Sequence, residues 1–227
     1  MPNKLSEVLH DADFDLNSLS QLLQISRETI NSLTIYHETL KFWQRKINLV
    51  APSTVDQAWH RHFLDSAQLV DALPDRPGHL IDLGSGAGFP GLVVGLLRRE
   101  KFGGCDAERL TLSEADQRKA AFLKEVCRKT GLVADIDVAR ITYSGENNSG
   151  VKADFVSARA FAPLPKLLAL AVPFFSNDTI GVFPKGRGWA DEVTAASDAW
   201  AFKLERKASE TDREGQILVM TELVRKA

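Results

Sequence analysis

The sequence predicts an α/β fold, in which a mostly parallel, seven-stranded sheet carries helices on both faces and follows an N-terminal helical extension. Residues 26–49 repeat apolar side chains at helical spacing, and from residue 79 onward strand and helix patterns alternate. The 227 residues are enough for one main domain with such an extension. Because alternating strand and helix units form parallel sheets, we expect a ligand crevice at the carboxyl ends of the strands.

The extension contains the most periodic segment of the chain. Apolar residues of 26–49 recur every three or four positions, which predicts a helix with one buried stripe. They are Leu33, Tyr36, Leu40, Trp43 and Ile47. So short a helical piece usually shares the core of a neighbour, so we expect residues 1–75 to pack on a main domain of residues 76–227.

A second helical pattern follows inside the extension. Val55, Trp59 and Phe63 lie about one helical turn apart, and the prolines of residues 73–78 end the pattern. Because Trp43 and Trp59 fit these helical stripes, we expect both indoles to pack in the core rather than to stack on bases.

The main domain alternates strands with helices. Apolar runs of strand length follow glycine, proline or polar loops, whereas helical patterns begin at Pro90, Asp116 and Leu164. The predicted strands span 79–83, 109–115, 132–139, 153–160, 179–183, 200–209 and 215–223, and the predicted helices span 90–99, 116–131 and 164–172.

The charge balance argues against a protein that coats nucleic acid by charge alone. The formal net charge is −2 at pH 7, and basic residues gather only in short groups such as 60–62, 98–101 and 185–187. Any contact with RNA or DNA is therefore expected to be local. His60 and Arg61 are candidate phosphate contacts, although we expect at least one of them to lie in solvent.

Nothing in the sequence marks the chain for export or for a membrane. Residues 1–16 carry acids where a signal peptide needs a basic end and an apolar stretch. The longest apolar stretch, 167–175, is far shorter than the ~20 residues of a membrane span. Cys105 and Cys127 lack the spacing of a disulfide framework or a zinc site. We therefore expect a cytoplasmic protein without a metal ion.

A glycine-rich turn follows the first predicted strand, in the stretch LIDLGSGAGFPG. Gly84, Gly86 and Gly88 permit a tight turn that a ligand can approach closely. Phe89 occupies the place of the third glycine of the dinucleotide fingerprint, and no lysine with serine or threonine follows, as a phosphate loop would need. Asp82, before the turn, suits a cation such as an amino-acid ammonium, held directly or through water. These features favour a nucleoside that carries an amino-acid tail.

The turn resembles motif I of the class I S-adenosylmethionine methyltransferases, which has the pattern D-x-G-x-G-x-G. Such folds usually place an acid at the end of the second strand, where paired carboxylate oxygens suit the two ribose hydroxyls. Glu114 occupies that place. Together, Asp82, the glycines and Glu114 predict S-adenosylmethionine as the cofactor.

The motifs that the chain lacks reduce the number of candidate methyl acceptors. Methylation of an exocyclic amine usually needs an Asn/Asp-Pro-Pro-Tyr/Phe segment after the fourth strand, where this chain has SARAFAPL. Methylation of pyrimidine carbon 5 needs a nucleophilic cysteine, yet Cys105 lies in a predicted loop and Cys127 on an apolar helix face. Guanine N7 has a free lone pair and needs only positioning, so its methylation requires neither of these features.

Five segments together resemble one family, the bacterial small-subunit ribosomal RNA N7-guanine methyltransferases, also called the glucose-inhibited division protein B family. The segments are INLVAPS, HFLDSA, DLGSGAGFPG, DFVSARAF and FPKG, and the likeness runs from about Trp43 to the end of the chain. It implies a class I fold and methyl transfer from S-adenosylmethionine to a guanine in the decoding region of 16S rRNA. The implied partner is 16S rRNA or the small ribosomal subunit.

The resemblance also assigns residues to the cofactor site. Ile141 and Thr142 match positions beside the adenine, although the family often has glutamate in place of Thr142. The other matched positions are Gly84, Phe89 and Glu114, the last at the place of the ribose-binding acid.

Arg159, in SARAF, matches an arginine at the active site of the family, and we expect it to be the catalytic residue. An unpaired arginine among apolar residues would be costly to bury, which independently favours a functional role. At the end of the fourth strand, Arg159 suits three partners, namely the cofactor carboxylate, guanine O6 or a phosphate. Lys185, which follows Pro184 where the family commonly has leucine, and Arg187 are candidate substrate contacts.

His62 and Asp65 lie three residues apart in HFLDSA, close enough for a local hydrogen bond on one helical turn. Two interpretations stay open for this pair. The pair docks the extension on the main domain, or His62 contacts RNA or closes the cofactor pocket.

Two other functions fit the same residues. A methyltransferase of this fold could instead act on another RNA, a protein or a small molecule, and for a protein or a small molecule the extension would be a substrate lid. A non-catalytic module would bind S-adenosylmethionine without turnover. The chain has no heptad repeat that suggests a coiled-coil dimer, so we expect a monomer.

Overall fold

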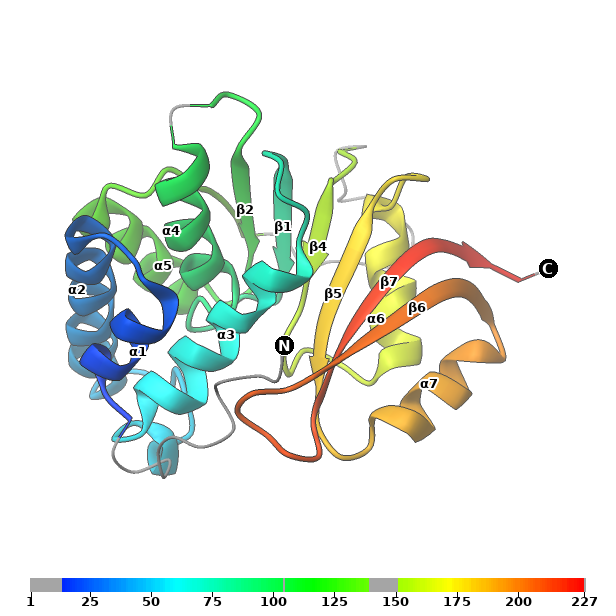
Figure 1. The fold of residues 1–227 in the computed structure, drawn as a ribbon, viewed down its shortest axis with the longest axis horizontal. Helices are drawn as coiled ribbons and strands as arrows, with labels where there is room; N and C mark the ends of the chain where they lie inside the picture. The colour runs from blue at the N-terminus through cyan, green and yellow to red at the C-terminus, as the bar shows by residue number, and fades with distance from the viewer. Residues whose placement is uncertain (1–13, 104, 139–150, 227) are drawn as a thin grey trace.

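The computed structural model describes residues 14–103, 105–138 and 151–226, and in these residues it contains a seven-stranded sheet (Figure 1). The strand order is β3-β2-β1-β4-β5-β7-β6, with β7 antiparallel to both of its neighbours and the other described pairs parallel. The strands are β1 (His79–Leu83), β2 (Arg109–Ser113), β3 (Asp135–Asp137), β4 (Phe155–Ser157), β5 (Ile180–Lys185), β6 (Trp200–Ala208) and β7 (Gln216–Arg225).

Helices cover both faces of the sheet, as predicted (Figure 1). One face packs against α2, α4 and α5, and the other against α6 and α7. Alternate strand residues divide accordingly, because Leu80 belongs to the first core and its neighbour Ile81 to the second. The helices are α1 (Leu16–Leu23), α2 (Arg27–Gln44), α3 (Asp65–Ala67), α4 (Gly91–Phe102), α5 (Gln117–Thr130), α6 (Leu164–Ala171) and α7 (Trp189–Ser197), with short helical turns η1 (Pro52–Thr54), η2 (Trp59–Leu64), η3 (Gln68–Ala72) and η4 (Val172–Phe174).

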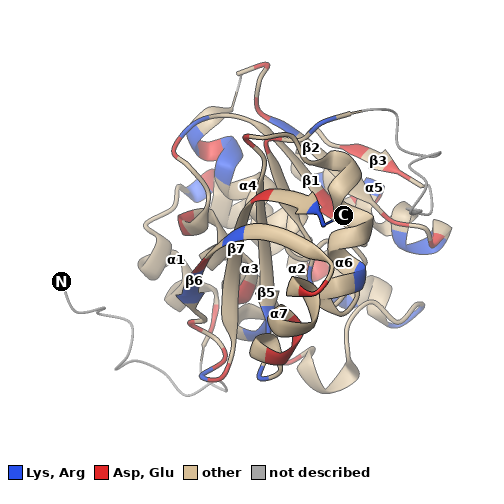
Figure 2. Cartoon of the chain, turned by 90° about the vertical axis from the view of Figure 1, so that its right-hand side faces the viewer, with Lys and Arg blue, Asp and Glu red and all other residues tan. Residues whose placement is uncertain are grey.

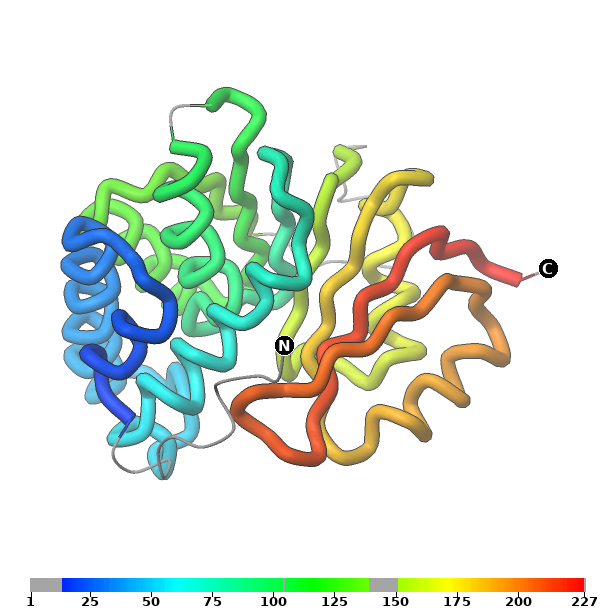
Figure 3. The backbone as a smooth tube through the Cα atoms, viewed as in Figure 1, coloured from blue at the N-terminus to red at the C-terminus, as the bar shows by residue number. Residues whose placement is uncertain are grey.

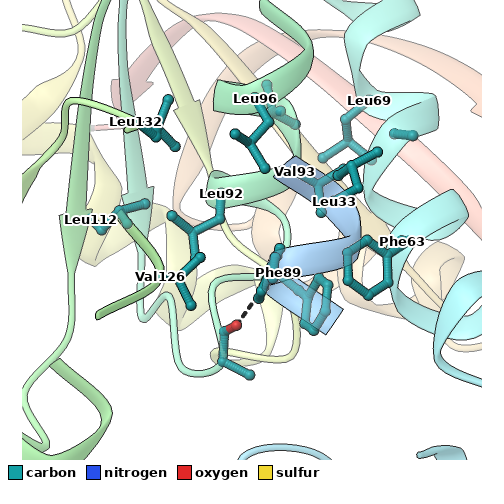
Figure 4. Packing of buried hydrophobic residues seen from close by; sticks show 14 of the residues in the cluster. Leu33, Phe63, Leu69, Phe89, Leu92, Val93, Leu96, Leu112, Val126 and Leu132 are labelled. Atoms are coloured by element: carbon teal, nitrogen blue, oxygen red, sulfur yellow. Dashed lines mark hydrogen bonds between the residues drawn. The ribbon is translucent and has the colours of Figure 1, made fainter. Parts of the chain in front are cut away.

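The extension contributes directly to the first of these cores. Leu33, Tyr36 and Leu40 of α2 are fully buried in the same cluster as Leu92 of α4 and Phe122 of α5. Figure 4 shows part of this cluster, with Leu33 and Leu92 among the labelled residues. Burying a large apolar side chain stabilises a fold by about 1.5–3 kcal/mol, so this shared core ties the helices before β1 to the sheet. The division into residues 1–75 and 76–227 stays a proposal, supported by the start of β1 at His79.

The first predicted helix ends earlier than expected. It stops at Gln44 instead of continuing to Leu49, because the side chain of Gln44 folds back onto the chain that follows. Its Oε1 accepts hydrogen bonds from the backbone N–H groups of Leu49 and Val50, and its Nε2 donates to the carbonyl of Val50. These bonds stabilise a turn in place of the last helical residues.

The second predicted helix is replaced by a series of short turns. After η1, residues 59–64 form the π-helical turn η2, and the chain then passes through α3 into η3. A π-helical turn re-aims the side chains that it carries and is frequent at functional sites.

The third and fourth strands are shorter than predicted, since β4 contains only Phe155–Ser157 of the expected 153–160, and two helices are additional. Residues 132–139 were expected to form a strand, but β3 contains only Asp135–Asp137, and Val133 is 89% exposed at this edge of the sheet. The helices α1 and α7 were not predicted. No helix of the described residues is long and apolar enough to cross a membrane.

Candidate functional site

The glycine turn lies between β1 and α4 and has the backbone that only glycine adopts freely. Gly84, Gly86 and Gly88 have φ angles of +67°, +56° and +88°. A Cβ at Gly84 would lie 2.2 Å from the ring of Phe161, whereas a Cβ at Gly86 would meet nothing nearer than 3.8 Å. The turn is therefore closed by Phe161 at one glycine and open to a ligand at another.

Asp82 lies beneath the turn and is fully buried. Its Oδ1 accepts a hydrogen bond of 2.7 Å from Ser157 of β4, and its Oδ2 accepts one of 3.3 Å from the backbone N–H of Gly91, the first residue of α4. Burial raises the pKa of Asp82 to about 6, although these hydrogen bonds oppose the shift. In this arrangement the carboxylate fastens the turn to α4 and β4.

Glu114 follows β2 and reaches the same turn. Its Oε2 accepts a hydrogen bond of 2.8 Å from the backbone N–H of Gly86, and its Oε1 accepts one of 2.8 Å from the backbone N–H of Asp116. The structure thus brings the predicted acid and the glycine turn together, although 28 residues separate Gly86 from Glu114.

Arg159 lies after β4 and is held by two residues of the extension. Its Nη2 is 2.5 Å from Nδ1 of His62, its Nη1 forms an ion pair of 2.9 Å with Asp65, and its guanidinium carbon lies 5.6 Å from the ring centre of Phe89. Nη1 is buried and makes no directed hydrogen bond to a described residue. A buried N–H group without such a bond favours a ligand that can accept one.

Phe89 occupies the centre of an aromatic cluster instead of facing outward. Its ring is 6% exposed and stacks on Tyr36 and His62 at centroid distances of 5.2 and 5.1 Å, with Phe63 edge-on at 5.2 Å. Phe63 and Phe89 are labelled in Figure 4. The side chain predicted to hold the cofactor thus packs in the core and supports Arg159 from below.

A pocket of about 580 Å³ opens beside Arg159. Its walls come from the loop after β4, the end of β5, α7 and the hairpin that joins β6 to β7, which Figure 3 shows as the orange-red turn at the base of the molecule. Residues that line it include Arg61, Asp65, Phe161, Lys185, Glu192 and Thr211. Because Phe161 also covers Gly84, the pocket and the glycine turn share a wall.

Lys185 and Arg187, the predicted substrate contacts, have different positions. Lys185 projects into the pocket from the end of β5, and its Nζ contacts Glu192 at 2.7 Å and the carbonyl of Ala162 at 2.9 Å. Arg187 has an 81% exposed side chain that pairs with Glu214 at 2.6 Å, and it does not line the pocket. Only Lys185 is thus brought to the site of Arg159.

The predicted local hydrogen bond between His62 and Asp65 is wrong. The carboxylate of Asp65 bonds Thr211, Gln68 and Arg159, whereas the nitrogens of His62 contact Thr54 and Arg159. His62, in the π-helical turn η2, and Asp65, the first residue of α3, each contact Arg159 and not each other.

A family model described as rRNA small subunit methyltransferase G matches residues 29–217, from α2 to β7. The chain belongs to this family. The ribosomal RNA small subunit methyltransferase G of Parvibaculum lavamentivorans is 45% identical over 205 residues, which are 90% of this chain and 88% of that protein. The protein of the same name from Rhodospirillum centenum is 46% identical over 199 residues, 88% of this chain and 87% of that protein.

Solved structures share the fold of this rRNA small subunit methyltransferase G family member. The PH0226 protein of Pyrococcus horikoshii has a TM-score of 0.55 at 9% identity, covering 81% of this chain and 98% of that one. The ribosomal protein L11 methylase of Lactobacillus delbrueckii has a TM-score of 0.52 at 14% identity, covering 71% and 77%. The predicted class I methyltransferase fold is confirmed, and a methyltransferase of this family and fold takes S-adenosylmethionine as methyl donor.

Several residues around Arg159 escaped prediction. Ala160 has a left-handed φ of +50°, unusual for a residue with a side chain, and Phe161 covers Gly84. Thr211 donates a hydrogen bond of 2.5 Å to Asp65, and Gln68 accepts one of 2.8 Å from the N–H of Glu210, so the hairpin is fastened to η3 and α3. No local pattern signals these contacts, because their partners lie more than 70 residues away.

Other predicted features have simpler outcomes. His60 is 7% exposed whereas Arg61 is exposed, so one of the two basic candidates lies in solvent as expected. Ile141 and Thr142 lie outside the described residues.

Burial raises the pKa of Cys127 to about 11, which fits a structural thiol. Among the residues that the structure describes, no group of three or more His, Cys, Asp or Glu is arranged to hold a metal ion.

Charges are mixed over the part of the molecule that carries β6, β7 and α7. Figure 2 looks onto this side and shows Lys and Arg interspersed with Asp and Glu along the described chain. Arg187 and Lys203, for example, pair with Glu214 and Glu222. Arg61, by contrast, is exposed and lines the pocket.

Proposed function

We propose that the chain transfers a methyl group from S-adenosylmethionine to N7 of a guanine in the decoding region of 16S rRNA. The observation that supports this proposal is the shared wall between the glycine turn and the pocket of Arg159, because a methyl donor bound at the turn would lie next to a base in the pocket. Membership of the rRNA small subunit methyltransferase G family supports the acceptor.

The residues around the glycine turn suit the proposed cofactor. Space at Gly86 lets a ligand approach the backbone, and Glu114, already bonded to that glycine, offers carboxylate oxygens to a ribose diol. We assign Asp82 a supporting role, because its two oxygens already fasten β4 and α4 to the turn. S-adenosylmethionine supplies an electrophilic methyl group on its sulfonium. Ile141 and Thr142 remain proposed contacts of the adenine.

The acceptor chemistry demands positioning rather than proton removal. Guanine N7 attacks with its own lone pair, so the pocket needs no general base, and the carboxylates of Asp65 and Glu192 are already paired with Arg159 and Lys185. We propose that the guanidinium of Arg159, which lines the pocket, donates to guanine O6, because O6 and N7 lie on the same edge of the base. Lys185 then contributes a second positive charge to the pocket.

The proposed partner is 16S rRNA, either free or within the small ribosomal subunit, bound by a monomer in the cytoplasm. Arg61 at the pocket and exposed Arg187 are the proposed phosphate contacts outside the base pocket. His62 is not proposed as an RNA contact, because its ring is buried beneath Arg159.

The acceptor molecule is tested with the full chain and S-adenosylmethionine labelled in its methyl group. Naked 16S rRNA, assembled small subunits, large-subunit rRNA and ribosomal protein are offered separately. We expect label in 16S rRNA, free or assembled, and none in the other two. Label in ribosomal protein, or cofactor binding with no transfer to any of them, would refute the proposal and favour one of the two other functions.

A further inference from the structure

His62 lies at the junction between the extension and Arg159. Its ring is 6% exposed and does not line the pocket. Its Nδ1 is 2.5 Å from Nη2 of Arg159, and its Nε2 is 2.8 Å from Oγ1 of Thr54. Both ring nitrogens therefore have a protein partner. One partner, Thr54, belongs to the extension, and the other, Arg159, belongs to the site.

These contacts determine which ring nitrogen carries the proton. A guanidinium can only donate, so Nδ1 of His62 must accept from Arg159 and carries no hydrogen. The hydroxyl of Thr54 donates to the carbonyl of Ala51 at 2.8 Å, which leaves its oxygen to accept from Nε2–H of His62. All three hydrogen bonds then point the same way, from Arg159 into the extension.

The neutral ring that this chain of hydrogen bonds requires agrees with its surroundings. Burial, followed by the positive charges of Arg159 and Arg61, lowers the pKa of His62 to about 3. The ring is stacked on Phe89, over which the guanidinium of Arg159 also lies. The opposite charge, on Asp65, contacts Nη1 of Arg159 and not the imidazole.

Arg159, which lines the pocket, is thus held on three sides. His62 fixes Nη2, Asp65 pairs with Nη1, and Phe89 supports the plane of the guanidinium. A side chain that is already fixed loses little freedom when a ligand binds, and its donors need no rearrangement during the reaction.

We propose that His62 and Thr54 are positioning residues, which hold the guanidinium of Arg159 in its working orientation through the chain of hydrogen bonds that ends at the carbonyl of Ala51. The inference rests on the proposed function for what Arg159 does in the pocket. The hydrogen-bond chain itself has a readout that is independent of methyl transfer.

That readout is ¹⁵N NMR of the full chain labelled at its histidine ring nitrogens. The spectra distinguish a protonated from an unprotonated ring nitrogen, and a His62→Asn sample identifies the signals of His62. We expect an unprotonated Nδ1 and a protonated Nε2 at neutral pH. A proton on Nδ1 would overturn the proposal, because Arg159 could then no longer donate to it.

Kinetics of two matched variants test the effect on Arg159. Thr54→Val removes the acceptor of Nε2–H with little change of shape, whereas Thr34→Val removes a similar half-buried hydroxyl, which among the described residues bonds only the carbonyl of Ile30 in α2. We expect Thr54→Val to lower kcat for 16S rRNA about three- to tenfold, the effect of one hydrogen bond. Thr34→Val should stay within about twofold of the native chain at that same scale. Equal kcat values for the two variants would contradict the proposal.

A second pair of variants separates positioning from packing. His62→Asn keeps an acceptor near the place of Nδ1, whereas His62→Phe keeps a stacked ring without any acceptor. We expect the kcat of His62→Asn to be about tenfold higher than that of His62→Phe, at equal cofactor affinity. This ratio corresponds to the loss of one buried hydrogen-bond acceptor for Arg159. The reverse order would show that only packing matters.

An Arg159→Ala variant distinguishes a failure of the proposed function of Arg159 from a failure of the positioning proposal. Full methyl transfer by Arg159→Ala would overturn the proposed function of the arginine and, with it, the need for positioning. A misplaced proton on His62 would overturn the positioning proposal alone. We expect neither result, but a loss of kcat in Arg159→Ala that is at least as large as the loss in His62→Phe.

Discussion

The hydroxyl of Tyr36, in the extension, donates a hydrogen bond of 2.5 Å to the carbonyl of Ala87, in the glycine turn. The two residues are 51 positions apart, and both are buried. Burial also raises the pKa of Tyr36 well above its ordinary value of 10, so the hydroxyl remains a donor at any working pH. The extension therefore shapes the turn between Gly86 and Gly88 and does not merely cover it.

Tyr36→Phe should weaken both the fold and the cofactor site. The change removes one oxygen from a packed ring and leaves the buried carbonyl of Ala87 without its donor, which costs about 1–3 kcal/mol. We expect a lower free energy of unfolding in denaturant and weaker binding of S-adenosylmethionine by calorimetry. Native affinity in this variant would show that the turn keeps its shape without the extension.

Gly84→Ala tests the close approach of Phe161, with Gly131→Ala as its control. Both glycines have a φ of +67°, but a Cβ at Gly131, after α5, meets nothing within 4 Å. The control should therefore lose only about 1–2 kcal/mol of stability, which is the cost of a left-handed backbone at a residue with a side chain. Gly84→Ala should lose more stability and also its cofactor binding, because Phe161 must move. Equal losses of stability in the two variants would contradict the packing at Gly84.

Asp82 should make the stability of the fold depend on pH. Burial raises its pKa from 3.8 to about 6, so the folded chain binds this proton more tightly than the unfolded chain does. The resulting stabilisation is complete below about pH 4 and is lost as the pH rises through about 6. Relative to Asp82→Asn, the native free energy of unfolding should fall by about 2 kcal/mol between about pH 4.5 and about pH 7.5. If the difference in free energy of unfolding between the two proteins does not vary with pH, the carboxylate of Asp82 is exposed to water and not buried.

Glu114→Ala should reduce cofactor affinity, whereas Glu125→Ala on α5 should not. The first variant removes charge-assisted hydrogen bonds worth about 1.5–3 kcal/mol, equivalent to about ten- to hundredfold in the dissociation constant. Glu125 pairs instead with Arg128 and Lys129 on the surface of α5. Calorimetric titration with S-adenosylmethionine compares the two, and equal affinities would exclude Glu114 from the site.

All seven predicted strands are present, although β3 and β4 are much shorter than expected. β1 covers the same residues, 79–83, as its predicted strand, because a short apolar run between a proline-containing loop and a glycine turn allows few alternatives. The helix α7 has a single buried residue, Ala196, and so offers no apolar stripe to detect. The excess length predicted around β3 came from apolar residues such as Val133, which lies exposed at the sheet edge.

The site was predictable where its residues belong to one local motif. The glycine turn, Glu114 and Lys185 follow directly from strand ends, and the structure places all of them at the expected edge of the sheet. The partners of Arg159 were not predictable in the same way. His62 lies 97 positions before Arg159, and only the packing of the extension on the sheet brings them into contact.

The central claim is methyl transfer to N7 of one guanine in 16S rRNA, and strand cleavage specific for N7-methylguanine tests it most directly. Small subunits and naked 16S rRNA that lack the modification are incubated with the full chain and S-adenosylmethionine, cleaved chemically, and mapped by primer extension. We predict a single new stop in the decoding region, absent when Arg159→Ala replaces the native chain. Methyl incorporation without cleavage at any guanine would contradict the claim, because the methyl group would then be on another atom.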